Sequence, residues 1–382
     1  MANMVIYRVQ VGAYLLKTNA DRTFKKLKQK GFNPIIIKSG KLYKVQVGAY
    51  ARIENAQNIQ KKLKNFGFKS IIVEYLVKQE DEPKVHEKQE VKPVDSQEHP
   101  RIRIWGIWFT ETCEEKYGDA TAIIQYDKDD NIEHVILIDT GMNGCDTIKK
   151  LKKAGVKKID AVVISHAHGD HYGFLTAVFD NFEVGALYLP DCTELNKYQK
   201  SYGNAIRNQE NKAKKRGISY AYLKRGSSFE IGKIKCDCIW QAPANKLSEH
   251  DSHHFVNNQS IVLVFTLDGI WKYHTAGDLQ NEANNLLCKE IADLKADVFK
   301  VQWHGDANAC NNTLCKAIKP KIAFWNYHHK EQSGRGTTRK RLESVGAIVA
   351  RNFENGDIYI DCIGNAMTLS SSKKNISATF KK

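Results

Sequence analysis

Four side chains able to bind a metal ion lie within six residues in the segment Ser165-His166-Ala167-His168-Gly169-Asp170-His171. The apolar run at residues 161–164 comes directly before it and is typical of a buried strand. Core packing does not require imidazole and carboxylate groups at this density. In a tight loop after a strand, the first two histidines can bind one metal ion while Asp170 and His171 turn toward a second. The segment therefore predicts a metal centre.

Two distant segments can complete that centre. Asp278 follows a predicted hairpin formed by residues 261–265 and 270–274, and a carboxylate at a strand end can bridge two cations. His304 comes shortly after another apolar strand, at residues 298–301. Because each group stands at the exit of a strand, we expect all of them to meet at one edge of the fold.

Two metal ions would lower the pKa of a bridging water and polarise the bond that it attacks, which is an ester, an amide or a phosphodiester. Asp170 is the expected catalytic residue, because it can orient the nucleophile while binding metal. Ser165 is expected to be a loop residue and not an attacking group. Zinc suits neutral imidazoles and a carboxylate with one position open for water, and manganese is the alternative.

The elements that must position these groups follow a layered α/β pattern from residue 101 onward. Short apolar runs at 121–124, 135–138 and 161–164 predict covered strands, and residues 147–154 have a helical pattern. A chain of 382 residues is too long for one ordinary core, so we expect two domains.

An internal repeat occupies the first part of the chain. Residues 7–14 return as residues 43–50, displaced by 36, and Gly31-Phe32 returns as Gly67-Phe68. Each copy alternates as a half-buried strand does, continues as a helix with one apolar stripe, and closes with a second strand at 35–37 or 71–73. Two such units predict a βαββαβ domain with one sheet and two helices.

The positive charge is concentrated in this repeat. Residues 1–76 hold 15 Lys and Arg against 3 Asp and Glu, whereas residues 77–100 hold 4 against 7. Such a basic surface suits nucleic acid or an anionic wall polymer, although a solvated Lys-rich helix face has the same composition. Residues 77–100 contain three prolines and few apolar groups, which predicts a flexible charged linker.

Composition excludes a membrane-spanning protein, because no run approaches the roughly 18 apolar residues of a transmembrane helix. The amino terminus has no secretory-signal pattern, so we expect synthesis in the cytoplasm, followed either by a cytoplasmic life or by association with the wall after release or non-classical export. The nine cysteines are scattered after residue 100 without a paired framework, which favours reduced thiols.

The histidine-rich segment, Asp139-Thr140-Gly141, Ala276-Gly277-Asp278 and Trp303-His304-Gly305 together resemble the metallo-β-lactamase superfamily. The resemblance covers roughly residues 101–364 and implies an αββα sandwich of two sheets between helices. Carried over to this sequence, it implies a two-metal site with the following ligands: His166 and His168 on the first metal, Asp170, His171 and His304 on the second, and Asp278 as the bridge.

Within that superfamily, Gly118-Asp119-Ala120-Thr121 and the segments at 257–260 and 319–323 look most like the hydrolase domain of bacterial competence DNA-uptake proteins, which are regarded as nucleases or phosphodiesterases. One departure concerns the third histidine that many members place on the first metal. Either Asn258 takes that position, or one of three nearby histidines does: His250, His253 and His254. Trp303 also stands where the competence group tends to have a histidine.

The repeat at residues 4–76 resembles the sporulation-related repeat (SPOR) domain, whose members bind peptidoglycan glycan strands. The doubled phrase Val-Gln-Val-Gly-Ala-Tyr carries this resemblance, which implies a targeting module. A basic sheet with Tyr14 and Tyr50 exposed is also suited to stacking the bases of RNA.

We therefore expect three parts: a SPOR-like peptidoglycan-binding domain at 1–76, a linker at 77–100 and a metallo-β-lactamase-fold hydrolase at 101–382. The expected function is hydrolysis of a polymeric phosphodiester, either DNA or a wall polymer. The alternatives are a β-lactam or other ester or amide hydrolase on the same metals, and a non-catalytic peptidoglycan-binding protein. His274 and the pair at 328–329 are expected to be structural or surface residues.

Overall fold

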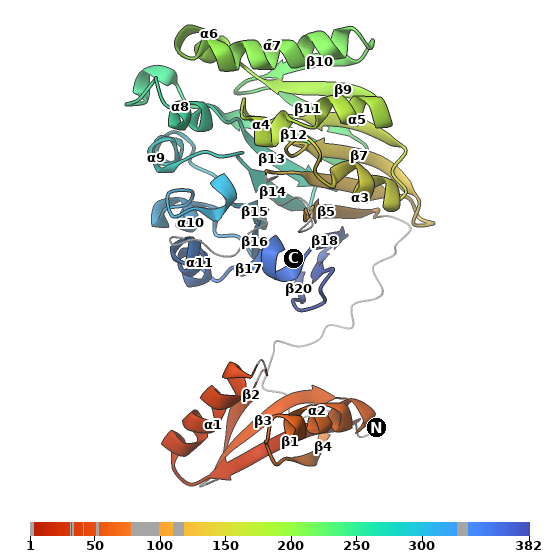
Figure 1. Cartoon of the computed structure of the whole chain (residues 1–382), viewed down its shortest axis with the longest axis vertical. Helices are drawn as coiled ribbons and strands as arrows, with labels where there is room; N and C mark the ends of the chain where they lie inside the picture. Colours follow the sequence, from red (N-terminus) through yellow and green to blue (C-terminus); the bar gives the residue numbers. More distant parts are fainter. Residues whose placement is uncertain are drawn as a thin grey trace. The chain divides into compact units, whose positions relative to one another are not determined.

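A computed structural model describes residues 4–30, 32, 34–40, 42–50, 53–77, 99–109, 118–326 and 335–382. The chain divides into two compact units, Met1–Val91 and Lys92–Lys382. Most of the predicted linker, residues 78–98, lies outside the described residues. Figure 1 shows both units.

The smaller unit is a four-stranded antiparallel sheet with two helices, in the strand order β2-β3-β1-β4. Its elements are β1 (Met4–Tyr14), α1 (Lys17–Gln29), β2 (Pro34–Ser39), β3 (Leu42–Tyr50), α2 (Ile53–Asn65) and β4 (Ile71–Val77). Both helices are amphipathic, and their apolar stripes pack on the sheet through buried side chains such as Ala20, Leu27 and Leu63. The predicted βαββαβ fold is confirmed.

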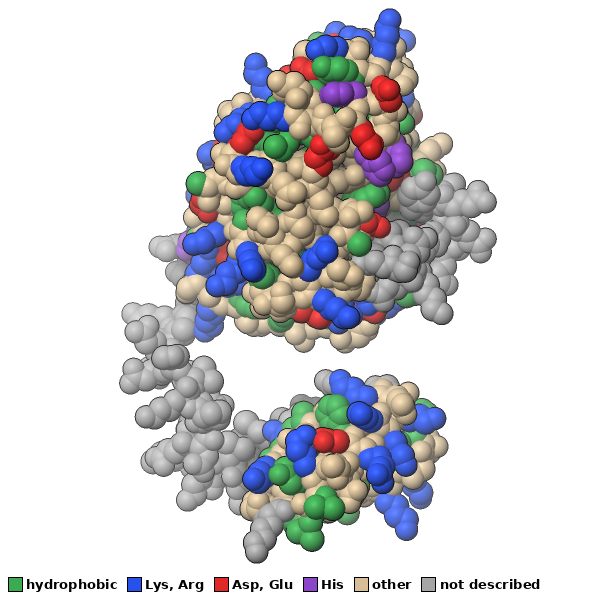
Figure 2. All heavy atoms as spheres, turned by 90° about the vertical axis from the view of Figure 1, so that its left-hand side faces the viewer, with side chains coloured by type: hydrophobic (Ala, Val, Ile, Leu, Met, Phe, Trp, Pro, Cys, Tyr) green, Lys and Arg blue, Asp and Glu red, His purple; other side chains and the backbone are tan. Residues whose placement is uncertain are grey.

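The two copies of the repeat meet along β1 and β3. These strands pair antiparallel, with Tyr14 opposite Tyr43 and Tyr7 opposite Tyr50. At the centre, Gln46 Nε2 donates a 3.0 Å hydrogen bond to Oε1 of Gln10, which occupies the equivalent position in the other copy. Equivalent strands therefore form the middle of the sheet, and each copy supplies one helix. Figure 2 shows a face of this unit on which Lys and Arg side chains are prominent and acidic side chains are few.

The larger unit contains two sheets. The nine-stranded sheet, in the order β10-β9-β8-β7-β6-β5-β18-β19-β20, consists of β5 (Arg101–Gly106), β6 (Thr121–Tyr126), β7 (Ile132–Ile138), β8 (Lys158–Val163), β9 (Glu183–Pro190), β10 (Ser219–Leu223), β18 (Ile358–Ile363), β19 (Ala366–Ser371) and β20 (Ala378–Lys381). The seven-stranded sheet, β11 to β17 in chain order, consists of β11 (Ser228–Ile231), β12 (Ile234–Trp240), β13 (Val262–Leu267), β14 (Trp271–Thr275), β15 (Val298–Lys300), β16 (Ile322–Trp325) and β17 (Ile348–Arg351).

Helices cover the outer face of each sheet (Figure 1). On the nine-stranded sheet they are α3 (Thr147–Lys153), α4 (Gly169–Tyr172), α5 (Leu175–Asn181), α6 (Thr193–Tyr198) and α7 (Lys200–Lys214). On the seven-stranded sheet they are α8 (His253–Asn258), α9 (Asn281–Glu290), α10 (Asn312–Ile318) and α11 (Arg335–Ser344). Short helical turns η1 (Ala244–Lys246), η2 (Trp303–Gly305) and α12 (Asn352–Asn355) complete the chain. The predicted αββα sandwich is confirmed.

The core between the sheets explains why the sequences of the strands are nearly continuous apolar runs. Side chains from both sheets, among them Ile136, Val163, Leu263 and Phe324, form one buried cluster. The opposite faces of the same strands pack under the helices, so both faces are covered. Strands β7, β8, β14 and β15 therefore form a rigid frame whose exits hold the polar residues described below.

The eight cysteines among the described residues are free thiols, and Cys113 lies outside them. No helix of the described chain combines the length and the apolarity that crossing a membrane requires.

Candidate metal centre

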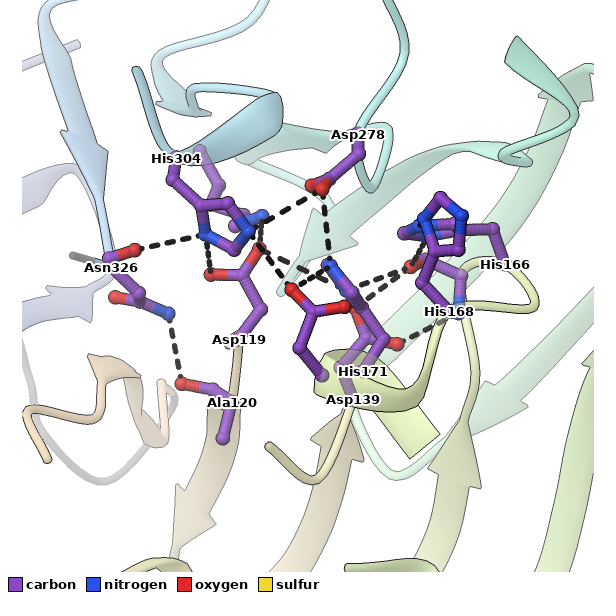
Figure 3. A network of polar contacts seen from close by, with 12 residues as sticks. Asp119, Ala120, Asp139, His166, His168, His171, Asp278, His304 and Asn326 are labelled. Carbon is purple, nitrogen blue, oxygen red and sulfur yellow. Dashed lines mark hydrogen bonds and ion pairs between the residues drawn. The ribbon is translucent and has the colours of Figure 1, made fainter. Parts of the chain in front are cut away.

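The histidine-rich segment forms the turn between β8 and α4. His166 and His168 lie in the loop, and Asp170 and His171 lie in the first turn of α4. The backbone N–H of Asp139 donates to the carbonyl of Val163 at 2.8 Å, which ties the exits of β7 and β8 together. The segment is therefore held at the edge of the nine-stranded sheet, as its position after an apolar strand predicts (Figure 3).

Asp278 and His304 reach the same place from the other sheet. Asp278 follows β14, and His304 lies in the turn η2 after β15. Gly277, at φ +48°, allows this approach, because a Cβ there would lie 2.7 Å from the hydroxyl oxygens of Ser165 and Ser260. His304 itself is left-handed, at φ +51°, which is a rare conformation for a residue with a side chain and is typical of functional sites.

These residues form a compact set of acids and imidazoles. The Oδ2 atom of Asp278 lies 3.3 Å from Nε2 of His171 and 3.4 Å from Nε2 of His304. The Oδ2 atom of Asp170 lies 3.2 Å from the same nitrogen of His304 and 3.6 Å from that of His171. Asp278 thus stands between two histidines that come from different sheets and belong to the same predicted metal site, and its role as a bridge between two metals stays a prediction.

A further carboxylate, Asp119, joins this set. The sequence does not predict it as a metal ligand. One ligand atom from each of Asp119, His171, Asp278 and His304 lies within 4.8 Å of the others, and all four residues are buried. Asp119 precedes β6, next to Gly118, where a Cβ would overlap the carbonyl oxygen of Asp170. The only sequence signal was the phrase Gly118-Asp119-Ala120-Thr121 within the competence-like pattern. We call these four residues, together with Asp170, the acidic half of the centre.

The acidic half fits a cation because several of its buried atoms lack a hydrogen-bond partner among the described residues. These atoms are Nε2 of His171 and one carboxylate oxygen, Oδ1, of both Asp119 and Asp278. Leaving a buried polar atom unpaired costs roughly 1–3 kcal/mol. Three such atoms in one cluster of acids and imidazoles are consistent with a metal site.

Three histidines are anchored through Nδ1, so that Nε2 faces the centre. His171 Nδ1 donates to Asp139 Oδ2 at 2.8 Å, and His304 Nδ1 donates to the carbonyl of Asn326 at 3.2 Å. Ser165 Oγ donates to Asp139 at 2.8 Å, so its 3.0 Å contact with His166 Nδ1 requires the hydrogen on that nitrogen. Partners of this kind fix the tautomer of metal-binding histidines. Asp139 therefore acts on His171 directly and on His166 through Ser165.

His166 and His168 form the other half of the centre, which we call the histidine pair. His166 Nε2 lies 3.0 Å from Nδ1 of His168, and the rings of His166 and His171 are 4.1 Å apart. His166 is fully buried, whereas His168 is partly exposed. The pair has a nitrogen-rich environment and no carboxylate in ion-pair contact among the described residues.

Electrostatics separate the two halves. Burial lowers the pKa of His304, but the charges of Asp278 and Asp119 outweigh it and raise this pKa to about 10. The pKa of His171 is likewise raised well above its ordinary value, because Asp278, Asp170 and Asp139 overcome the effect of burial. In the histidine pair, burial lowers the pKa of both rings, most strongly in His166, where the neighbouring charge of His171 adds to it.

Asn257, which precedes one of the residues considered for the third-histidine position, approaches the histidine pair. Its side chain contacts His168, whereas Asn258 Oδ1 accepts a 3.0 Å hydrogen bond from the backbone N–H of Gln280. His250 stacks on Tyr198 with ring centroids 4.2 Å apart and donates to the carbonyl of Ala244. The ligand in the third-histidine position, for which the sequence leaves Asn258, His250, His253 and His254 open, stays a prediction.

The remaining sequence candidates lie outside the acidic half and the histidine pair. His253 and His254 pack on each other, and His254 meets Trp303 edge to face at 5.7 Å. His274 is fully buried within β14 against Phe299, and burial lowers its pKa to about 4. The structure thus gives His274 a packing role, as expected, while residues 328–329 lie outside the described part of the chain.

Lys300 is the one cation buried beside the acidic half among the described residues. Its ammonium forms an ion pair with Asp119, and the charges of Asp119 and Asp278 raise its pKa against the effect of burial. Lys300 lies in β15, four residues before His304, so the same strand supplies a histidine and the counter-charge of a neighbouring carboxylate. This residue was part of the apolar strand pattern and carried no separate signal.

Comparison with known proteins agrees with both parts of the chain. Residues 5–74 match the SPOR domain family, and residues 124–209 match the metallo-beta-lactamase superfamily. ComE operon protein 3 of Bacillus subtilis (strain 168) is 24% identical over 216 residues, which is 54% of this chain and 25% of that protein. Transcription termination factor FttA of Methanococcus maripaludis is 29% identical over 169 residues, 41% of this chain and 25% of that protein. The chain spans about a quarter of the length of these curated relatives.

Among solved structures, the peptidoglycan-binding domain of the Bacillus subtilis cell wall lytic enzyme CwlC is 36% identical, and the match covers 20% of this chain and 95% of that one with a TM-score of 0.19. The two family matches lie one on each unit, and the larger one includes the whole histidine-rich segment. The chain therefore combines an amino-terminal SPOR domain with a metallo-beta-lactamase domain.

Proposed function

We propose that the metallo-beta-lactamase domain is a metal-dependent phosphodiesterase that acts on a polymeric substrate, and that the SPOR domain directs it to peptidoglycan. The observation that carries this proposal is the acidic half of the centre, where buried acids and imidazoles from both sheets lie within 4.8 Å and leave three polar atoms without a hydrogen-bond partner among the described residues. A degenerate, non-catalytic site would not retain so complete a set of unpaired groups at this cost.

The proposed ligands divide between two cations. His171, His304, Asp170 and Asp119 would hold one of them, and His166 and His168 the other, with Asp278 shared between the two. Zinc suits the imidazoles of the histidine pair, and manganese suits the carboxylate-rich acidic half. When bound, such ions supply Lewis acidity, which activates water and neutralises charge that develops on the substrate.

The protein's own residues give that chemistry its geometry. Asp139 keeps the hydrogen of His171 on Nδ1, so that Nε2 is available. Asn326 does the same for His304 through its carbonyl oxygen. Asp170 reaches both histidines from the first turn of α4, where it can orient an attacking water. Lys300 offsets the charge of Asp119 and so lowers the cost of gathering carboxylates in a buried place.

A phosphodiester is the favoured bond because its reaction develops negative charge on several oxygens, which paired cations neutralise. The resemblance to the competence proteins points to the same chemistry. A polymer is the favoured substrate because a wall-bound module raises the local concentration of the attached domain on polymers of the envelope. DNA and a phosphodiester-linked wall polymer such as teichoic acid both meet these conditions.

The test is an assay of the purified full chain, loaded with zinc or with manganese, on bis(p-nitrophenyl) phosphate, plasmid DNA, teichoic acid and nitrocefin. We expect hydrolysis of the phosphodiesters. His304→Ala is expected to abolish it, while His134→Gln, which removes a histidine from the opposite end of β7, serves as the matched control. A thermal melt of each variant separates loss of activity from loss of folding.

Each outcome of the assay bears on the proposal. Cleavage of nitrocefin alone would replace a phosphodiesterase with a β-lactam hydrolase on the same metals. If a protein with full metal occupancy hydrolyses none of the substrates, a non-catalytic peptidoglycan-binding protein is favoured. Pelleting of the full chain with purified peptidoglycan tests the SPOR domain separately, and failure to pellet would remove the proposed targeting.

A further inference from the structure

A groove of about 500 Å³ lies between α7 and Tyr172, the residue after His171. Tyr172 forms one wall, and the other wall is one face of α7, with Ala205, Asn208, Gln209, Lys212 and Lys215 among its lining residues. Ala205, Gln209 and Lys212 on α7 and Lys215 at its C-cap are three or four residues apart, so they lie on the same side of the helix. None of them belongs to the centre described above.

Two tyrosines connect this groove to the centre. Tyr172 comes directly after His171, and Tyr202 lies one helical turn before Ala205 on the groove side of α7. The ring of Tyr202 meets His168 edge to face, with centroids 5.4 Å apart. A strand lying in the groove would therefore pass aromatic rings before reaching the histidine pair.

The charges on α7 differ between the groove side and the outer side. Lys214 is paired with Glu210 at 2.5 Å and Arg216 with Asp180 at 2.7 Å, so these cations already have acidic partners. Within the described part of the chain, neither groove lysine has a carboxylate partner. Lys212 donates to the neutral side-chain amide of Gln209 at 3.2 Å. The groove thus offers two uncompensated cations and the neutral amides of Asn208, Gln209 and Asn211, a combination suited to a phosphate backbone.

We propose that this groove is the binding track for a single-stranded polynucleotide whose scissile phosphodiester lies at the metal centre. The inference rests on the proposed phosphodiesterase function and adds the substrate class and its path. Cations that track the backbone and aromatic rings that stack bases are the two features by which proteins bind single strands. A teichoic acid offers phosphates but no flat rings, so the two tyrosines favour nucleic acid.

The length of the track sets a minimum substrate. From Tyr202 to Lys212 the helix rises about 15 Å at 1.5 Å per residue. This distance corresponds to about four nucleotides at the duplex spacing of roughly 3.4 Å, and to fewer in an extended strand. A dinucleotide held at the centre does not reach Lys212 or Lys215, whereas a strand of six nucleotides does.

The experiment compares kcat/KM of the metal-loaded full chain on a single-stranded hexanucleotide and on the dinucleotide thymidylyl-thymidine. In the double variant Lys212→Ala/Lys215→Ala, the ratio of the two values is expected to fall roughly tenfold, because two phosphate contacts are lost. The dependence of log kcat/KM on log salt should become shallower by about 1.4, the value for two contacts to a single strand. Lys214→Ala removes a cation from the same helix turn and is the matched control.

Tyr202→Leu and Tyr202→Phe test the contribution of the ring. Loss of hexanucleotide binding in the leucine variant, with retention in the phenylalanine variant, is expected if bases stack on it. The basic SPOR domain is identical in all variants, so its own attraction for nucleic acid cancels in each comparison. A circular dichroism spectrum and a thermal melt identify any variant that fails to fold.

The outcomes separate this inference from the function on which it rests. If the wild-type protein cleaves neither oligonucleotide nor bis(p-nitrophenyl) phosphate, the phosphodiesterase proposal fails. If it cleaves the hexanucleotide and the lysine double variant keeps the wild-type ratio and salt dependence, the groove is not the track. If Lys212→Ala/Lys215→Ala lowers kcat/KM more for teichoic acid than for the hexanucleotide, the assignment of a polynucleotide substrate is wrong.

Discussion

The two halves of the metal centre lie side by side but differ in their chemistry. In the acidic half, carboxylates outweigh burial and hold His171 and His304 in their protonated forms, with raised pKa values. In the histidine pair, burial dominates and keeps His166 and His168 neutral. Without a cation, protons balance the charge of the acidic half, whereas the histidine pair carries none. A cation bound at the acidic half would therefore replace protons that balance the carboxylates. A cation bound at the histidine pair would replace none.

The difference also bears on the order of binding. Asp119, Asp170 and Asp278 attract a divalent ion at short range, and the low polarity of a buried site strengthens that attraction. The histidine pair offers two neutral nitrogens, and the side chain of Asn257 contacts one of its rings. We therefore expect the acidic half to fill first and to hold its ion more tightly.

The largest effect is expected from Asp278→Ala, because this carboxylate touches both histidines of the acidic half and is the proposed bridge between the halves. Loss of roughly a thousandfold in kcat/KM for bis(p-nitrophenyl) phosphate is expected. Metal content, measured by mass spectrometry of the dialysed protein, should fall at both positions. A variant that keeps two ions per chain would show that the halves do not depend on this bridge.

Single ligand deletions should separate the halves. His304→Ala removes an acidic-half ligand and is expected to leave the chain unable to retain a first ion. His168→Ala should leave one ion bound, with a smaller loss of activity, because the acidic half is intact. Titration with metal under a competing chelator measures both affinities, and equal losses in the two variants would contradict the proposed order of binding.

Asp139→Asn changes the hydrogen bonding of both halves without deleting a proposed ligand. Its carboxylate accepts from His171 and from Ser165, which in turn contacts His166. Losing such a partner typically costs 10- to 100-fold in metal affinity or activity. Asp237→Asn on β12, where the side chain of Asp237 is partly exposed, is a matched control, because it makes the same chemical change away from the centre. An unchanged affinity in Asp139→Asn would show that the histidines are oriented by packing alone.

The smallest expected effect is the number of protons released when metal binds. Metal ions bind neutral imidazole, so filling the acidic half at pH 7 should release about two protons, one each from His171 and His304. The histidine pair, already neutral, should release none. Because the pKa of His304 is raised to about 10 and that of His171 is also raised, metal affinity at the acidic half should increase with pH until these rings lose their protons, up to about pH 10 for His304. Calorimetry in buffers of different ionisation enthalpy measures the release, and a value near zero would contradict the protonated acidic half.

The sequence predicts the fold and much of the centre for a common reason. Apolar runs that end in a polar residue identify strand exits, and the exits of neighbouring strands converge at one edge of a sheet. This logic brings together the histidine-rich segment, Asp278 and His304. The repeat in the smaller unit is equally visible, because both copies keep the same strand and helix pattern.

What the sequence could not give depends on side-chain direction and on contacts between distant segments. Asp119 precedes its strand, so the strand-exit logic does not reach it. The third-histidine position, open between Asn258 and the three histidines before it, depends on side-chain directions along α8, where a step of one residue rotates a side chain by about 100°. Lys300 looks like an interruption in an apolar strand until its partner across the sandwich is known. The groove along α7 requires the packing of α7 against α4, for which no local pattern exists.

The most direct test is a crystal structure of the full chain soaked with zinc or manganese, with an anomalous difference map recorded at the absorption edge of the metal. We expect a strong peak between Asp278, His171 and His304, at roughly 2.0–2.2 Å from their ligand atoms. A second, weaker peak is expected beside His166 and His168. A map with no peak at the acidic half, in crystals that contain the metal, would contradict the account at its centre.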